Sequence, residues 1–264
     1  MNSLGKSLCA FWNSSIGKKI VVAVTGILLV GFLLGHMAGN LLVFAGREAM
    51  NDYAYFLHHM LHGAGIWFAR IGLLVAVVLH IVATVSLTLH NKASRQEKYE
   101  HEATVQASRS SRMMIVSGLI ILAFIIFHIL HFTVRVDSGL ADLKDPLDAS
   151  RHDTYGMVIA GFNVPWVVLF YVVAISLLCS HLSHGIASIF QTLGLRSAKT
   201  EKATKALSWG ITILLWIGFL IIPLTVLLNI VNDKEAAGQA AIENSAVHNL
   251  TGYRPSLNQV PSAE

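Results

Sequence analysis

Five long apolar runs constrain the fold of this chain more than any other feature of its sequence. They cover residues 20–45, 66–90, 113–134, 164–190 and 207–231, and none of them contains Asp or Glu. A helix needs about 20 apolar residues to cross the hydrocarbon core of a bilayer, so each run is long enough to span it. The sequence therefore predicts an all-α membrane protein with five transmembrane helices in a bundle.

The composition also indicates a membrane protein. The chain has 264 residues, of which 54% are hydrophobic and 13% are charged, whereas a soluble domain carries about 25% charged residues. The net charge of +4 does not indicate a nucleic-acid partner, because membrane proteins gather Lys and Arg in their cytoplasmic loops. Cys9 and Cys179 have no paired spacing, so we expect neither a disulfide framework nor a Cys-rich metal site.

The distribution of basic residues predicts the orientation in the membrane. They precede the first run and fill the second and fourth connections, as Lys18, Lys19, Lys92, Arg95, Lys98, Arg109, Arg112, Arg196, Lys199, Lys202 and Lys205. The positive-inside rule then places the N-terminus inside and the C-terminus outside. We expect a transmembrane domain over 1–231, with its first span retained rather than cleaved, and a polar tail over 232–264. The 51–65 stretch is too polar to span and predicts a short helix at the outer interface.

Histidines are the ionisable residues that lie deep in the predicted spans: His36, His80, His128, His131, His181 and His184. Intramembrane ionisable groups are costly and indicate function. Proton relays and divalent-cation transporters usually place carboxylates along their path, and these spans have none. Neutral imidazole instead suits iron, copper or zinc.

The histidines fall at two predicted depths. Counted from the basic ends at about 1.5 Å per residue, His36 and His128 lie about 26 and 24 Å up, whereas His80 and His181 lie about 15 Å up. Two imidazoles in one layer can hold a six-coordinate haem iron, so two layers about 10 Å apart predict two stacked haems enclosed by the bundle. No C-x-x-C-H attachment motif occurs, so the haems would be non-covalent, that is two haem b.

Several positions keep two interpretations. Gly31, Gly35 and Gly39 on one helix face, and Gly72 with Ala76 before His80, either permit close helix packing or leave room for a porphyrin. In the close pairs His128/His131 and His181/His184, one ring would be the ligand and the other a hydrogen-bond partner or proton carrier. A solvated surface suits the remaining outer histidines, His58, His59 and His62.

The ordered set of these motifs resembles the dihaem cytochrome b membrane subunit of succinate dehydrogenases and fumarate reductases, in particular its five-helix b558 type. The family's four axial histidines match His36 in GHMAGN, His80 in VLHIV, His128 in FHILH and His181 in SHLSHG. The alignment, with Gly185 four residues after His181, favours His181 over His184, and it favours His128 over His131. The segment EAMNDYAYFL after the first span is similar to the family's EA-aromatic-N segment.

The resemblance implies a function in electron transfer. A flavoprotein subunit and an iron–sulfur subunit would lie on the inner, cytoplasmic side of a bacterial cytoplasmic membrane. The inner haem, held by His80 and His181, would exchange electrons with that iron–sulfur partner. The outer haem, held by His36 and His128, would exchange them with menaquinone or menaquinol. The chain alone would not act on succinate or fumarate.

The resemblance leaves the quinone contacts open. Relatives can use an acidic residue near the outer end of the second helix, and this helix has none; Glu48, Asp52 and His62 lie just before it. Arg70 and Arg135, at outer helix ends, would contact haem propionates or a quinone carbonyl, or else snorkel to the interface.

Two other functions stay open. One is the haem b subunit of another respiratory dehydrogenase, of the formate dehydrogenase or hydrogenase type. The other is a histidine-lined metal or proton transporter.

Overall fold

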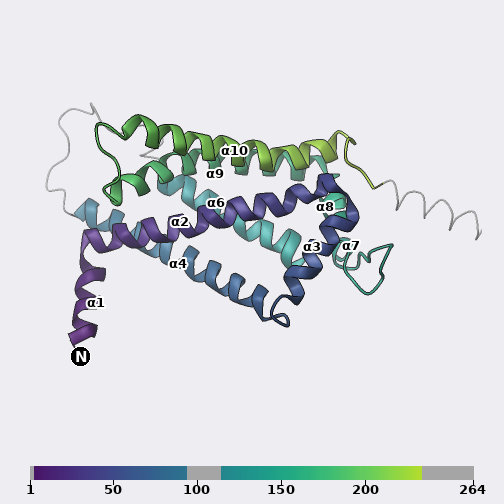
Figure 1. The fold of residues 1–264 in the computed structure, drawn as a ribbon, viewed down its shortest axis with the longest axis horizontal. Helices are drawn as coiled ribbons and strands as arrows, with labels where there is room; N and C mark the ends of the chain where they lie inside the picture. The colour runs from purple at the N-terminus through teal and green to yellow at the C-terminus, as the bar shows by residue number, and fades with distance from the viewer. Residues whose placement is uncertain (1–2, 94–113, 234–264) are drawn as a thin grey trace, which may run out of the picture.

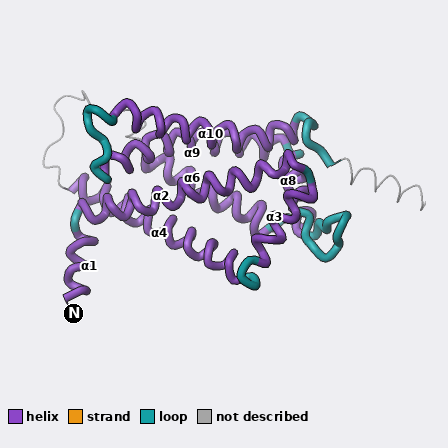
Figure 2. The backbone as a smooth tube through the Cα atoms, viewed as in Figure 1, coloured by secondary structure: helices purple, strands orange, loops and turns teal. Residues whose placement is uncertain are grey.

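Five long helices form the body of the protein. The computed structural model describes residues 3–93 and 114–233, and these helices run side by side along one direction (Figure 1). They are α2 (Ser15–Asn40), α4 (Ala64–Ala93), α6 (Met114–His128), α9 (Pro165–Thr192) and α10 (Glu201–Leu227). A 3₁₀ turn, Leu41–Ala45, extends α2, and a π-helical turn, Ile129–Val134, extends α6. Within the described ranges there is no strand (Figure 2).

The prediction of five spanning helices is confirmed by their length and hydropathy. Their bounds differ modestly from the apolar runs, because a helix continues past the hydrocarbon wherever its ends are capped. The side chain of Ser14 accepts a hydrogen bond from the N–H of Gly17, so α2 begins at Ser15. The fifth helix begins at Glu201, where its carboxylate pairs with Arg196 and Lys205, and it ends at Leu227 rather than 231.

Two helix pairs have the most extensive packing, and a further helix joins one of them. α2 packs along α4, and α10 packs along α9; α6 lies against α9, and both α9 and α10 contact α2. The buried apolar cores lie mainly among α2, α9 and α10, with members such as Met37, Ile175, Leu215 and Leu220. By contrast, only 11% of the most apolar window is buried in α4 and in α6, against 39% in α9 and α10. The apolar residues of α4 and α6 are therefore less buried by other helices than those of α9 and α10.

Short helices cover the end of the bundle opposite to the N-terminus. They are α3 (Arg47–His59), α7 (Ser138–Ala141) and α8 (Thr154–Phe162), all at the same end in Figure 1. The helix expected over 51–65 begins four residues earlier and ends at His59, because Leu61 and His62 adopt positive φ angles of 52° and 54°. α8 was not anticipated; it is too short to span, and nearly all of its residues are buried.

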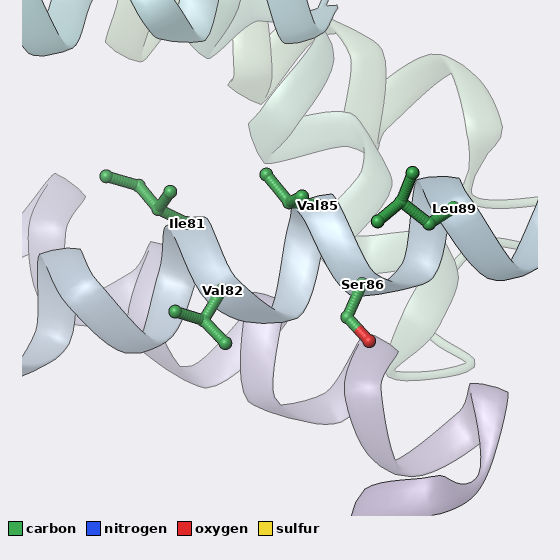
Figure 3. A pocket seen from close by; sticks show the side chains of 5 residues that line it. All are labelled: Ile81, Val82, Val85, Ser86 and Leu89. Atoms are coloured by element: carbon green, nitrogen blue, oxygen red, sulfur yellow. The ribbon is translucent and has the colours of Figure 1, made fainter.

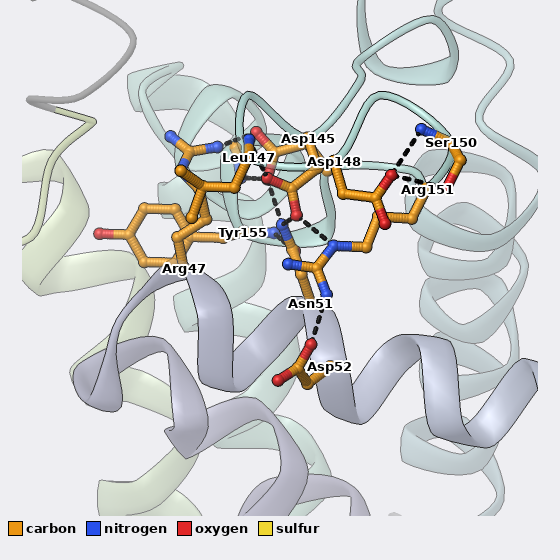
Figure 4. Close-up of polar contacts among 11 residues, drawn as sticks. Arg47, Asn51, Asp52, Asp145, Leu147, Asp148, Ser150, Arg151 and Tyr155 are labelled. Atoms are coloured by element: carbon orange, nitrogen blue, oxygen red, sulfur yellow. Dashed lines mark hydrogen bonds and ion pairs between the residues drawn. The ribbon is translucent and has the colours of Figure 1, made fainter.

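A buried polar network joins α3 to the segment around α7 and α8 (Figure 4). The Asn51 amide donates to Asp145 at 2.8 Å and to Asp153 at 2.9 Å, and its oxygen accepts from the N–H of Tyr155 at 2.9 Å. Arg151 donates to the same Asp145 carboxylate at 2.5 Å. All three hydrogen-bonding groups of the Asn51 amide are therefore used, as a side chain that is 1% exposed requires.

Arg47 strengthens the same network. Its guanidinium pairs with Asp153 and with Asp233, and it lies over the ring of Tyr155. Burial disfavours its charge, but the bond to Asp233 and the charge of Asp153 outweigh burial, so the pKa of Arg47 is raised. This network ties α3 and α8 to the segment that follows α10.

Some of the basic residues that predict the orientation in the membrane lie outside the described ranges. The basic positions Arg95, Lys98, Arg109 and Arg112, and the polar tail from 234 to 264, lie outside the described residues.

Candidate functional site

The rings of His36 and His128 face each other between α2 and α6. Their centres are 5.8 Å apart and their planes are inclined at 82°. Two imidazoles bound to one haem iron have ring centres about 6 Å apart, because each metal–nitrogen bond is about 2 Å long and each ring centre lies about 1 Å beyond its nitrogen. The structure thus brings this predicted outer pair to the spacing that a six-coordinate iron requires.

Aromatic side chains surround the outer pair. Phe32 stacks on His36 with ring centres 5.2 Å apart, and Phe219 of α10 lies 6.0 Å away. Phe124 and Phe132 lie 6.0 and 5.8 Å from His128. These apolar rings suit the faces and edges of a macrocycle.

His80 on α4 and His181 on α9 are the predicted second pair. Each of these side chains is half-buried. Nδ1 of His80 lies 3.0 Å from the hydroxyl of Thr25 on α2, and Nδ1 of His181 lies 3.1 Å from the hydroxyl of Ser117 on α6. Each ring is therefore held by a helix that packs against its own.

These hydroxyls can select which ring nitrogen is available. The hydroxyl of Thr25 lies 2.7 Å from the carbonyl of Val21, and that of Ser117 lies 3.0 Å from the carbonyl of Met114. A hydroxyl that donates to its carbonyl accepts from the histidine, and in the tautomer with the proton on Nδ1 the Nε2 atom keeps its lone pair. Fixing the distal nitrogen in this way is how proteins orient a metal-binding imidazole.

α2 and α6 carry the same four-position pattern. Thr25, Gly26, Phe32 and His36 correspond in spacing to Ser117, Gly118, Phe124 and His128. A Cβ added at Gly26 would lie 3.8 Å from the His80 ring, and one at Gly118 would lie 3.7 Å from the His181 ring. Each rising helix thus supplies a hydroxyl and a glycine to the inner pair and, eleven residues later, a ring to the outer pair.

The eleven-residue spacing revises the predicted distance between the layers. Because Thr25 lies level with His80, the two layers are about 16 Å apart along α2, and the same spacing holds along α6, rather than about 10 Å. The inner layer lies seven residues above Lys18, or about 10 Å, rather than about 15 Å. The predicted height of about 15 Å was counted along α4 and α9 from their own ends, whereas the contacts with Thr25 and Ser117 place the two rings directly against α2 and α6.

Tyr171 on α9 connects the two histidines at the top of α6. Its hydroxyl lies 3.0 Å from Nδ1 of His128 and 3.3 Å from Nδ1 of His131. The π-helical turn begins directly after His128 and contains His131; such turns are frequent at functional sites. His128 faces His36, and His131 is its hydrogen-bonded neighbour through Tyr171.

Glycines leave open space along the candidate site. A Cβ added at Gly31, Gly35, Gly72 or Gly185 would meet no atom within 4 Å, whereas one at Gly39 would lie 2.6 Å from the ring of Tyr53. Close packing therefore accounts for Gly39 and not for Gly31 or Gly35. Gly31, Gly35 and Gly72 are exposed, so the surface beside them is open either to lipid or to a planar group such as haem.

The other predicted contacts lie at the outer end. Arg70 stacks over Trp67 at 5.2 Å, and Arg135 follows the π-helical turn with a φ of 57°. Asp52 pairs with Arg151, and Glu48 and His62 are exposed, as are His58 and His59. None of these residues joins the histidine pairs.

Three contributors were missed from the sequence: Thr25, Ser117 and Tyr171. Thr25 and Ser117 could have been found from the sequence, because a hydroxyl residue, a glycine, a phenylalanine and a histidine recur at the same spacing in both helices. Tyr171 offered no such pattern, because its contact with His128 depends on how α9 packs on α6.

Elsewhere an apolar groove runs along the second half of α4. Ile81, Val82, Val85, Ser86 and Leu89 line it (Figure 3). It has no titratable side chain and so offers no chemistry of its own.

Within the described ranges, no three or more His, Cys, Asp or Glu side chains converge into a metal cluster. A haem needs only two protein ligands, since the porphyrin supplies the other four. Comparisons with protein-family models, with curated proteins and with solved structures find no match. Fold and site together define the class: a multi-pass helical membrane protein in which the rings of His36 and His128 lie close together.

Proposed function

We propose that this chain is the membrane-anchor cytochrome b subunit of a succinate:quinone oxidoreductase, acting as succinate dehydrogenase or fumarate reductase. The observation that supports the proposal is the set of four intramembrane histidines on four helices: the rings of His36 and His128 have centres 5.8 Å apart, and the Nδ1 atoms of His80 and His181 each lie beside a hydroxyl of a neighbouring helix.

In this proposal the side chains act as fixed ligands. His36 and His128 hold the outer haem b, and His80 and His181 hold the inner one. When bound, the two haems supply one-electron transfer across the membrane. Thr25 and Ser117 hold the inner imidazoles through their Nδ1 atoms, which would leave Nε2 for the iron, and Tyr171 holds His128 through its Nδ1 atom.

The surroundings of the pairs suit such a role. The rings lie on apolar helices, and a Cβ at Gly31, Gly35, Gly72 or Gly185 would meet no atom within 4 Å, so these positions offer room for a planar group. Low polarity around an iron and hydrogen bonds to its ligands are the two means by which a protein sets its potential.

The proposed partners follow from the two ends of the bundle. A flavoprotein and an iron–sulfur subunit dock at the basic, cytoplasmic end of a bacterial cytoplasmic membrane, nearer to His80 and His181. Menaquinone reacts at the other end, nearer to His36 and His128, where Arg70 and Arg135 lie. Asp52 is a weaker candidate for proton delivery, because Arg151 neutralises it.

A haem count tests the proposal most directly. The purified chain, reduced with dithionite, is expected to show low-spin b-type bands and two haems per chain by pyridine haemochrome. His36→Ala and His128→Ala should each remove chiefly one haem, and His80→Ala and His181→Ala chiefly the other. One haem or none in the unaltered chain contradicts the proposal.

The choice of enzyme needs a second measurement. In native membranes succinate should reduce these haems, and the chain should co-purify with a flavoprotein and an iron–sulfur protein. Reduction by formate or hydrogen instead would assign the chain to another respiratory dehydrogenase.

A further inference from the structure

The N-terminal helix α1 (Ser3–Asn13) carries an apolar stripe with nothing packed on it. Leu4, Leu8 and Phe11 repeat at intervals of four and three residues and are 66%, 60% and 41% exposed. Lys6 lies on the opposite face of the helix. No residue of α1 is buried, so this amphipathic helix contributes nothing to the core of the bundle.

The junction with α2 fixes where α1 lies. Only Ser14 separates the two helices, and its N–H donates to the carbonyl of Phe11 at 3.1 Å while its hydroxyl caps α2. A Cβ added at Gly17 would come within 2.0 Å of the Phe11 carbonyl oxygen. The close approach of α1 to the first turn of α2 therefore depends on glycine, and it leaves α1 little freedom to swing.

The position of the spanning helices indicates where α1 lies relative to the membrane. Lys18 and Lys19 mark the membrane boundary at the start of α2. Figure 1 shows α1 turned across the long axis of the bundle at this end, so it runs along the membrane surface rather than into the water. Ile16, at the start of α2, is 72% exposed, and Val24, Ile27 and Leu28 further along α2 are exposed as well. Exposed apolar side chains therefore occur on both sides of the junction between α1 and the spanning helix α2.

We propose that α1 is an in-plane membrane-surface helix. Leu4, Leu8 and Phe11 insert among the acyl chains of the leaflet at the N-terminal end, and Lys6 faces water and lipid phosphate. Aliphatic and aromatic residues opposite a basic face are typical of helices that lie at this depth. The inference concerns the lipid surface and is independent of the histidine pairs.

The cysteine content of the chain allows a direct test. Cys9 is exposed and Cys179 is buried, so Cys9→Ala gives a background with no accessible thiol. Leu8→Cys on the stripe and Ala10→Cys on the opposite side each add one labelling site. The full chain, carrying a nitroxide at either site, is placed in vesicles of phosphatidylcholine and phosphatidylglycerol, and collisions with oxygen and with a chelated nickel ion are measured by electron paramagnetic resonance.

The two positions should report opposite environments. The label at position 8 is expected to meet oxygen severalfold more than nickel, and the label at position 10 to meet nickel more. High nickel access at both positions would mean that α1 stands in water. Shielding of position 8 from both relaxants would mean that protein covers the stripe. Either result overturns the proposal. The labelled Cys9→Ala parent is the control for reaction at Cys179.

Discussion

The hydroxyl of Thr25 lies 3.0 Å from Nδ1 of His80, across the interface between α2 and α4. When Thr25 donates to the carbonyl of Val21, which lies 2.7 Å away, its hydroxyl accepts from the ring. The threonine then favours the tautomer with the proton on Nδ1, which leaves Nε2 free.

Replacing Thr25 by Val should weaken the inner site. The substitution keeps the shape but leaves the Nδ1–H of His80 without its acceptor, and loss of such a partner typically costs about 10–100-fold in metal affinity. We expect one of the two haems to be lost on dilution or mild detergent exchange, measured by pyridine haemochrome. Thr25→Ser, which keeps the hydroxyl, is the matched control and should retain both haems. If Thr25→Val retained as much haem as Thr25→Ser, Thr25 would have no role in orienting His80.

Ser117 should behave as its counterpart on α6. Ser117→Ala removes the acceptor of His181 at the same inner layer, so the same haem should be affected as with Thr25→Val. Spectra of the two variants, compared with those of His80→Ala, decide this. Loss of the haem that depends on His36 would show that the two hydroxyls do not serve one layer.

Tyr171→Phe should alter the outer site alone. The ring and its packing against Phe124 remain, but His128 and His131 lose their shared hydroxyl. Removal of one such bond costs about 0.5–1.5 kcal/mol, so the protein should stay folded with a small fall in its melting temperature. The electron paramagnetic resonance signal of one haem should shift while the other is unchanged; a change in both, or in neither, would contradict the assignment.

Gly35→Leu tests whether the open space belongs to the cofactor. No atom lies within 4 Å of a Cβ at this position, so the chain should fold normally and lose haem. Gly39→Ala provides the contrast, because its Cβ would clash with Tyr53 at 2.6 Å and should lower thermal stability. If Gly35→Leu keeps its full haem content, the space beside Gly35 faces lipid.

The network around Asn51 should make the outer end sensitive to acid. Burial opposes the charge of Asp145, but the N–H of Leu147, the Asn51 amide and Arg151 outweigh it and hold its pKa below 3.8. A lowered pKa in the folded state contributes stability that is fully present above the unfolded value and is lost as pH falls through the folded value. Proteolysis of the 137–153 segment should therefore accelerate once the pH falls below 3.8.

Asp145→Asn is the matched variant for that prediction. It should raise the rate of cleavage at neutral pH, because the amide cannot replace the charge that Arg151 and Asn51 contact, at a cost of about 1–3 kcal/mol. It should also flatten the acid dependence. An unchanged pH profile in Asp145→Asn would assign the acid sensitivity to another carboxylate.

Much of the fold could be predicted from local sequence. Long apolar runs without acids can only be spanning helices, so the five spans were found with small errors at their ends. α8 was missed because its apolar residues are too few to span and show no turn pattern; its burial depends on Asp153 and Asn51, which lie far apart in the chain.

The histidine arrangement was only partly accessible. Counting residues along helices placed His36 level with His128, and the structure brings those rings together. The separation of the layers was misjudged because the heights were counted from the ends of four different helices, which need not lie at one level; a mismatch of four residues displaces a ring by about 6 Å. The hydroxyl contacts of Thr25, Ser117 and Tyr171 depend on neighbouring helices, and hydropathy carries no information about them.

The four-position pattern on α2 and α6 has a mechanical consequence. Each of these helices is a single rod that touches both layers, with Thr25 or Ser117 at one level and His36 or His128 at the other. A rotation or translation of either helix therefore displaces both histidine layers together. The distance between the two layers is set by eleven residues of continuous α-helix, which act as a rigid spacer.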